Sequence, residues 1–321
     1  MIGAGLTYVG VVVRHVEGVA AILERDFLLP RTCCAIGSTG RQAPVFSVGR
    51  TPVALFESGD PFVGGAGRTG VHHLAVAVDD LGSASREAAQ RGAPAISAQP
   101  EAGLGGARRL LLDPTSTGGV VTYLSEPLAL SITDGGLVER IDHVGIASQD
   151  NNMALDLFSR RLGWAVESTQ TDVEVSTTVE SFTSDKYGVV YHARLPEVVG
   201  GLRAAFITIG DCELEFLQNL DHRNLSLASA GGVRYPLSGS TRQDQGVISR
   251  YIASRGPGLH HIALKVQDID GLLGALHKAG HTMIDTAGRP GSRRARIGFI
   301  HPASLGGLLV HLVQREEAAA N

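Results

Sequence analysis

The chain has 321 residues, of which 43% are hydrophobic and 19% charged, with a formal net charge of −4 at pH 7. Such a composition is typical of a globular protein of about two domains and argues against a general nucleic-acid binder. No apolar stretch approaches the roughly 20 residues that cross a bilayer, no secretory leader precedes the first strand, and the three cysteines form no disulfide framework, so we expect a cytoplasmic protein without membrane association.

One short pattern, an apolar strand followed by an amphipathic helix, occurs four times along the chain. A repeat of this kind indicates a single supersecondary unit used four times. Further apolar or alternating runs follow each copy and predict additional strands. The four strand–helix copies are predicted at residues 6–29, 71–92, 141–163 and 259–280. The additional strands are predicted at residues 45–48, 53–56, 119–123, 202–209, 212–217, 297–300 and 308–313.

The four copies group into two halves. The segment from Asp113 to Tyr123 aligns without a gap with the segment from His301 to His311, so both halves close on the same hairpin. We therefore predict an N-terminal module at residues 1–127, a linker at 128–138 and a C-terminal module at 139–316. A polar insert at residues 219–247, before a predicted helix at 248–254, is interpreted as either a lid or a surface loop.

Four charge-capable residues of the second half lie inside apolar, strand-like runs. Burying such groups among aliphatic side chains is costly unless something neutralises them, and a divalent cation would do so. Imidazole and carboxylate ligands suit Fe, Co, Zn, Ni or Mn better than Ca or Mg. Any one of these histidines alone would more often be a packed core residue. Together they predict a site for one divalent transition metal, with the ligands His143, Glu215, His261 and His311.

The repeat supplies an internal comparison for this prediction. At the four aligned positions the first half has Tyr8, Ala54, His73 and Tyr123, so one candidate ligand remains there. A structural role common to both halves would not predict this difference. We therefore expect a metal in the second half and packed side chains in the first.

The chain resembles tandem members of the vicinal oxygen chelate superfamily, which contains glyoxalases, extradiol dioxygenases, 4-hydroxyphenylpyruvate dioxygenase and methylmalonyl-CoA epimerase. The resemblance rests on three segments of the second half, which is most similar to the epimerase. These are Ile141-Asp-His-Val-Gly-Ile-Ala147, Ile252-Ala-Ser-Arg-Gly-Pro-Gly-Leu-His-His-Ile-Ala263 and Phe299-Ile-His-Pro-Ala-Ser-Leu-Gly-Gly-Leu-Leu-Val310. In the first half it rests on the repeat and on Val71-His-His-Leu-Ala75.

The resemblance implies an α+β fold of two modules. Each module would contain two βαβββ units that form a curled mixed sheet around a cup. It also implies Lewis-acid-assisted proton transfer next to a carbonyl, as in epimerases, isomerases and glyoxalases. An Fe(II) dioxygenase of the extradiol or 4-hydroxyphenylpyruvate type is the alternative, and a non-enzymatic small-molecule binder is the third. The family has a Glu at the last ligand position, where this chain has His311, and a ligating His cannot also be a free base.

Catalytic and substrate-binding roles are predicted from position in the sequence alone. His192, on a probable strand, and His311 are the candidate catalytic residues. His260 precedes a ligand in its strand, so its side chain is predicted on the opposite face. Arg293, Arg294 and Arg296 are predicted to bind an anionic part of a substrate. The expected partner is a small carboxylate, acyl-CoA or aromatic compound, and a homodimer is possible.

Overall fold

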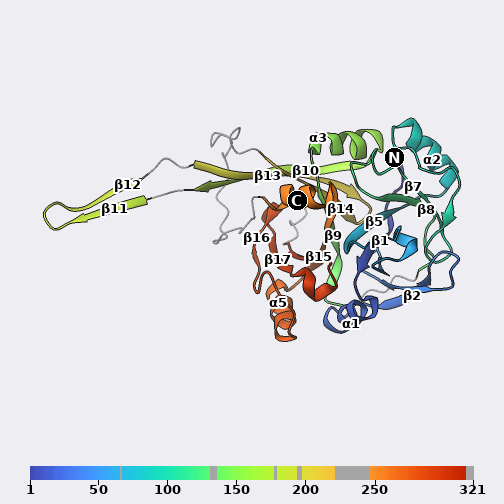
Figure 1. Ribbon diagram of the computed structural model, residues 1–321, viewed down its shortest axis with the longest axis horizontal. Coiled ribbons are helices and arrows are strands. Elements are labelled where there is room, and N and C mark those ends of the chain that lie inside the picture. Colours follow the sequence, from blue (N-terminus) through green and yellow to red (C-terminus); the bar gives the residue numbers. More distant parts are fainter. Residues whose placement is uncertain (66, 131–135, 177–178, 194–196, 221–245, 316–321) are drawn as a thin grey trace, which may run out of the picture.

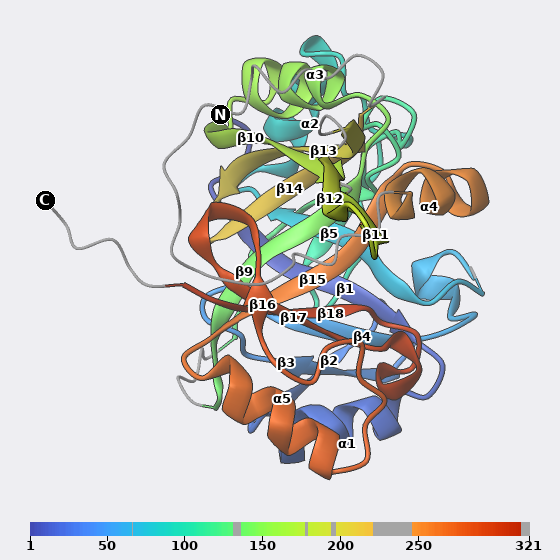
Figure 2. The same ribbon diagram turned by 90° about the vertical axis from the view of Figure 1, so that its left-hand side faces the viewer.

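The computed structural model describes the chain except residues 66, 131–135, 177–178, 194–196, 221–245 and 316–321. Most of the polar insert at residues 219–247, interpreted as a lid or a surface loop, falls outside the described residues. The described chain forms two eight-stranded mixed sheets with the same strand arrangement, and a separate two-stranded ribbon. Both sheets are curled, with helices on their outer side (Figures 1 and 2). This is the predicted α+β fold of tandem modules.

The first sheet runs in the order β2-β3-β4-β1-β5-β8-β7-β6. Each half of this sheet is one βαβββ unit. The first strands of the two units, β1 and β5, pair antiparallel at the centre of the sheet. The last strand of each unit, β4 or β8, lies beside the first strand of the same unit. The strands are β1 Leu6–Val13, β2 Arg31–Ala35, β3 Gln42–Phe46, β4 Val53–Glu57, β5 Gly70–Ala77, β6 Glu101–Ala102, β7 Arg108–Leu111 and β8 Thr122–Ser125, with helices α1 Val16–Asp26 and α2 Leu81–Gln90.

The second sheet repeats this order as β10-β13-β14-β9-β15-β18-β17-β16. Its strands are β9 Val138–Ala147, β10 Ala165–Ser176, β13 Glu197–Ile209, β14 Cys212–Asn219, β15 Gly258–Val266, β16 Arg289–Pro290, β17 Arg296–Ile300 and β18 Val310–Gln314. Its helices are α3 Asn151–Ala154, continued by a π-helical segment at Leu155–Arg161, then α4 Val247–Arg255 and α5 Ile269–Lys278. The ribbon pairs β11 Val179–Ser184 with β12 Gly188–Ala193 and projects away from both sheets (Figure 1).

The two modules share one hydrophobic core. A single cluster of buried residues takes aliphatic side chains from the central strands of both sheets. Polar contacts join the modules at its edges: the Trp164 indole donates to the Ile2 carbonyl at 2.8 Å, and Asp211 accepts from the Thr51 hydroxyl at 2.8 Å. Asp26, at the end of α1, lies 2.7 Å from His281, just beyond α5, and Figure 2 shows these helices side by side. The shared core fixes the two cups relative to each other.

The strand register confirms the predicted alignment of the halves. Two glycines, Gly10 of β1 and Gly145 of β9, occupy equivalent positions opposite His73 and His261. A methyl group added to Gly10 would lie 2.1 Å from Cε1 of His73, and one added to Gly145 would lie 2.0 Å from Cε1 of His261. Both histidine rings therefore lie directly over a glycine, and each cup needs a residue without a side chain at this position.

The first prediction follows from this contact. We expect Gly10→Ala to lower the free energy of unfolding by about 1–3 kcal/mol, because the His73 ring is fully buried and must shift into packed neighbours. Gly274→Ala is the control: Gly274 lies inside helix α5 with nothing within 4 Å of an added methyl group. That change should stabilise the chain by up to about 1 kcal/mol. Urea unfolding measures both, and an unchanged stability of Gly10→Ala would contradict the close packing.

Candidate metal centre

Four neighbouring strands bring the four predicted ligands together. His143 lies on β9, Glu215 on β14, His261 on β15 and His311 on β18, and these strands are adjacent in the order β14-β9-β15-β18. Their register places Gly145 opposite both Glu215 and His261, and Ala263 opposite both His143 and His311. The four side chains therefore converge on one side of the sheet, and each residue is at least 94% buried.

The nitrogen and oxygen atoms of the cluster lie at close range. Nε2 of His143 is 3.2 Å from Oε2 of Glu215 and 3.3 Å from Nε2 of His261. Nε2 of His261 is 3.7 Å from the same Glu215 oxygen. The three imidazoles each offer a ring nitrogen within 4.8 Å of the others. This spacing suits a group of ligand atoms around one ion.

The environment favours the charged form of two candidate ligands and the neutral form of the other two. Burial alone would lower the pKa of His143, but the Glu215 charge and the hydrogen bond to Asp142 raise this pKa to about 9. Burial alone would raise the pKa of Glu215, but the charge and hydrogen bond of His143 lower it to about 2. Burial and neighbouring positive charge hold the pKa values of His261 and His311 well below the usual range. Before an ion binds, these shifts favour an ion pair of His143 with Glu215 and neutral imidazoles at His261 and His311. An ion that binds His143 would replace the proton on its Nε2.

His311 provides the test of whether these residues fit a metal. Its ring is stacked on Phe299, with centroids 4.3 Å apart and an interplanar angle of 9°. Both of its ring nitrogens are buried without a hydrogen-bond partner among the described residues. Buried polar atoms without partners are uncommon in native proteins and call for an explanation such as an ion or water. Three imidazoles and one carboxylate are also the donor chemistry of transition-metal sites. The residues present therefore fit a divalent transition metal.

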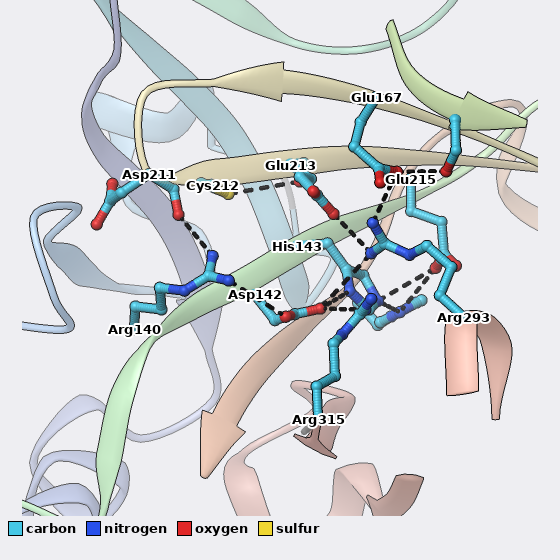
Figure 3. A network of polar contacts seen from close by, with 12 residues as sticks. Arg140, Asp142, His143, Glu167, Asp211, Cys212, Glu213, Glu215, Arg293 and Arg315 are labelled. Carbon is cyan, nitrogen blue, oxygen red and sulfur yellow. Dashed lines mark hydrogen bonds and ion pairs between the residues drawn. The ribbon is translucent and has the colours of Figure 1, made fainter. Parts of the chain in front are cut away.

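A network of charges surrounds His143 on the side away from the ligand cluster. Nδ1 of His143 donates to Oδ2 of Asp142 at 2.8 Å. Asp142 is 98% buried and is balanced by Arg315 at 2.6 Å and by Arg293 at 3.9 Å. Figure 3 shows Asp142 between these guanidinium groups and Arg140. A metal-ligating histidine commonly donates its second nitrogen to a carboxylate, which fixes its tautomer and orientation. The sequence analysis did not identify Asp142 in this role.

The predicted anion-binding arginines occupy three different environments. Arg293 lies over the Phe206 ring at 3.6 Å and pairs with Glu213 at 2.6 Å and Glu167 at 2.9 Å, so it holds its loop against β10 and β14. Arg296 pairs with Asp270 at 2.7 Å, and Arg294 is exposed. Arg289, in the same loop, lines the cavity described next. The structure therefore disperses Arg293, Arg294 and Arg296, and their role in substrate binding stays a prediction.

A cavity of about 330 Å³ opens onto the ligand cluster. Glu215, His261 and His311 form part of its wall, and most of the remaining wall is apolar. The other lining residues are Leu202, Leu217, Asn219, Val247, Ile248, His260, Ile284, Arg289, Ser292, Ile297, Phe299 and Leu309. The prediction that His260 faces away from the cluster is wrong, because a local irregularity of β15 turns it into this cavity. His192 lies on β12 of the projecting ribbon, an arrangement that does not favour its predicted catalytic role.

The equivalent positions of the first module hold packed side chains. Tyr8, Ala54, His73 and Tyr123 are all at least 94% buried. The Tyr8 hydroxyl lies 3.1 Å from Nε2 of His73, and the Tyr123 ring meets the His73 ring edge-on. Arg109 covers the Tyr123 ring at 4.1 Å. His73 is the only histidine at these four positions, and its Nε2 contacts the Tyr8 hydroxyl, whereas Nε2 of His261 faces further candidate ligand atoms.

The fold and this cluster define a tandem protein of curled mixed sheets with a metal-type ligand set in its second module. Residues 142–299 match the model of the Glyoxalase/Bleomycin resistance protein/Dioxygenase superfamily. The second module therefore belongs to this superfamily. No curated protein matches the chain.

Three solved structures illustrate the likeness. A 4-hydroxymandelate synthase variant from Streptomyces coelicolor is 15% identical, with a TM-score of 0.61, and the match covers 100% of this chain and 95% of the synthase. A hypothetical protein from Bacillus halodurans C-125 is 24% identical over 57% of this chain and 98% of its own, with a TM-score of 0.38. A methylmalonyl-CoA epimerase from Mycobacterium tuberculosis is 23% identical over 57% of this chain and 93% of its own, with a TM-score of 0.37. The synthase shares the fold over the whole chain.

The second prediction compares the two cups directly. We expect the purified chain to bind about one divalent metal, and His261→Ala to lose it, because three imidazoles of the second module lie close together and Glu215 lies beside two of them. His73→Ala is the matched control, since Tyr8, Ala54 and Tyr123 occupy the other three equivalent positions and the first cup should not contribute to metal content. Elemental analysis after supplementation with Co²⁺ or Zn²⁺ measures both. Two metals per chain, or equal loss in both variants, would contradict the assignment of the site to the second module.

Proposed function

We propose that the second module is a metal-dependent enzyme that assists proton transfer at a carbon next to a carbonyl group. The observation that supports this most directly is the position of the cluster, because Glu215, His261 and His311 are both buried and part of a cavity wall. A purely structural ion would more often be closed off by its ligands, whereas a catalytic site keeps access for a substrate.

His143, Glu215, His261 and His311 would hold one divalent transition metal, and this metal would supply a Lewis acid for a carbonyl oxygen. The apolar wall, which includes Leu217 and Ile297, would surround the body of the substrate. Excluding water in this way strengthens electrostatic interactions within the site. The volume of about 330 Å³ suits a small acyl or aromatic group.

Arg289 adds positive charge to the cavity wall. Its guanidinium group lies 5.4 Å from the Phe299 ring, and its Nε lies 3.1 Å from the buried carboxylate of Asp285. Asp285 therefore orients Arg289 at the wall that contains Phe299 and His311. A positive charge in this position favours a substrate carboxylate or the negative charge that develops on a carbonyl oxygen.

His311 has two possible roles in this chemistry, and the two are distinguishable. Its unpartnered ring nitrogens could complete the ligand set, or one could accept the proton of the substrate. A ligating nitrogen has no lone pair left for a proton, so one nitrogen cannot do both. Because the rings of His143, His261 and His311 have centroids 5.3 to 5.5 Å apart, we favour ligation.

The third prediction tests this role. We expect His311→Ala to weaken metal binding by about tenfold or more, a scale that even outer-shell partners of a metal can reach. His311→Glu should keep the metal, because a carboxylate replaces an imidazole as a ligand. Competition with a chelator measures the metal Kd of both variants. Full metal affinity in His311→Ala with loss of turnover would instead make His311 the base.

The fourth prediction tests the reaction. The Co²⁺- or Zn²⁺-loaded chain should exchange a C–H hydrogen next to a carbonyl for deuterium when a panel of 2-oxo acids and acyl thioesters is incubated in D2O without dioxygen. Mass spectrometry detects the exchange, and His261→Ala is the inactive control because it removes a ligand that faces the cavity. Binding of panel members without exchange or any other turnover would indicate a non-enzymatic binding protein.

An Fe(II) dioxygenase is the second candidate. His143, His261 and Glu215 form a set of two imidazoles and one carboxylate, which is the ligand pattern of many non-haem iron oxygenases. Two results together would favour the dioxygenase over proton transfer: turnover that requires both Fe²⁺ and dioxygen, and no deuterium exchange when dioxygen is absent.

A further inference from the structure

His260 occupies an irregular position in β15. The pairing of β15 with β9 passes from Leu259↔Ile146 directly to His261↔Gly145, so His260 is the extra residue of a β-bulge. In a regular strand its side chain would point to the face opposite that of His261. A bulge re-aims one side chain of a strand, and here His260 lines the same cavity as His261 and His311.

His260 contacts the ligand His261 through a single pair of nitrogens. Nδ1 of His260 lies 3.0 Å from Nδ1 of His261. The other nitrogen of the His261 ring, Nε2, faces the cluster and lies 3.3 Å from Nε2 of His143. Two imidazole nitrogens at 3.0 Å need one proton between them, so one ring donates and the other accepts.

The cluster determines which ring donates. For Nε2 of His261 to offer a lone pair to an ion, the neutral ring must carry its proton on Nδ1. Nδ1 of His261 then donates to Nδ1 of His260, and the proton of His260 lies on Nε2. The Tyr251 ring meets His260 edge-on at 4.6 Å, and the Tyr251 hydroxyl donates to the Leu259 carbonyl at 2.6 Å, which fixes His260 in this orientation.

We propose that His260 is a positioning residue that holds His261 in the tautomer whose Nε2 lone pair faces the ligand cluster. This inference rests on the proposed function, because it assumes that the cluster binds a metal. The arrangement parallels that of the other bulged pair, in which Asp142 accepts from Nδ1 of His143. Two ligands would thus each be oriented by the residue that precedes them.

The first module supplies a matched control. His72 is also a bulge residue, and its Nδ1 lies 2.9 Å from Nδ1 of His73. Nε2 of His73, however, meets the Tyr8 hydroxyl rather than a set of ligand atoms. Replacing His72 removes the same kind of contact from an equivalent strand without affecting the ligand cluster.

The fifth prediction tests the proposal on the full chain, with Co²⁺ as the probe. We expect His260→Leu to raise the Kd for Co²⁺ by about 10–100-fold, the usual effect of removing an outer-shell partner. His260→Gln, whose amide oxygen can still accept, should restore most of the affinity, and His72→Leu should bind as the unmodified chain does. Chelator competition measures the Kd, and the visible spectrum of bound Co²⁺ reports the geometry of its ligands.

A second readout does not depend on how the variants fold. In the ¹⁵N-labelled, Zn²⁺-loaded chain, imidazole nitrogen shifts should show His261 protonated at Nδ1 and His260 protonated at Nε2. A proton on Nδ1 of His260 would overturn the proposal. Equal Co²⁺ affinity of His260→Leu and the unmodified chain would also overturn it, but would leave the metal site in place. Absence of any metal binding in the unmodified chain would overturn the inference and the proposed function together.

Discussion

The structure of the second module depends on compensating the free-energy cost of burying charged side chains among apolar strands. His143 and Glu215 compensate each other as an ion pair at 3.2 Å. Behind them, Asp142 is balanced by Arg315 and Arg293, and Arg293 in turn is balanced by Glu213 and Glu167. Charges of alternating sign thus extend from the ligand cluster toward the surface (Figure 3). Breaking one pair would leave an uncompensated buried charge. These contacts therefore hold the loop that contains Arg293 against strands β9, β10 and β14.

The first module shows that the sheet itself does not require this compensation. Strand order, register and glycine position are the same in both modules, yet Tyr8 and Tyr123 stand where His143 and His311 stand in the second. A phenol ring fills volume and its hydroxyl can serve as the partner of one histidine. The same backbone therefore supports either a packed core or a ligand cluster, and the choice depends on a few side chains. Function belongs to the site rather than to the fold.

Both modules have β-bulges on the two central strands of the sheet. Each central strand pair skips a residue at two equivalent positions: Thr7 and His72 in the first module, Asp142 and His260 in the second, where the pairing also skips Glu139. A bulge places two consecutive side chains closer to one face than a regular strand allows. In the second module this puts a hydrogen-bond acceptor next to each of two ligands. In the first, the hydroxyl of Thr7 is buried without a partner among the described residues.

Sequence alone determined the repeat and the tandem α+β fold, and it predicted four residues that the structure brings together, because a periodic apolar pattern with histidines at fixed places can be recognised without knowledge of contacts. The strands that it missed include β2, β7 and β10, whose polar or short sequences form strands only because a neighbouring strand supplies their hydrogen bonds. It also placed His260 on the wrong face and gave Asp142 no role. Alternation along a strand predicts facing only while the register is regular, and the bulges that break it are set by strand pairing. Which charges balance one another was likewise decided by tertiary structure, since Asp142 and Arg315 are 173 residues apart in the chain.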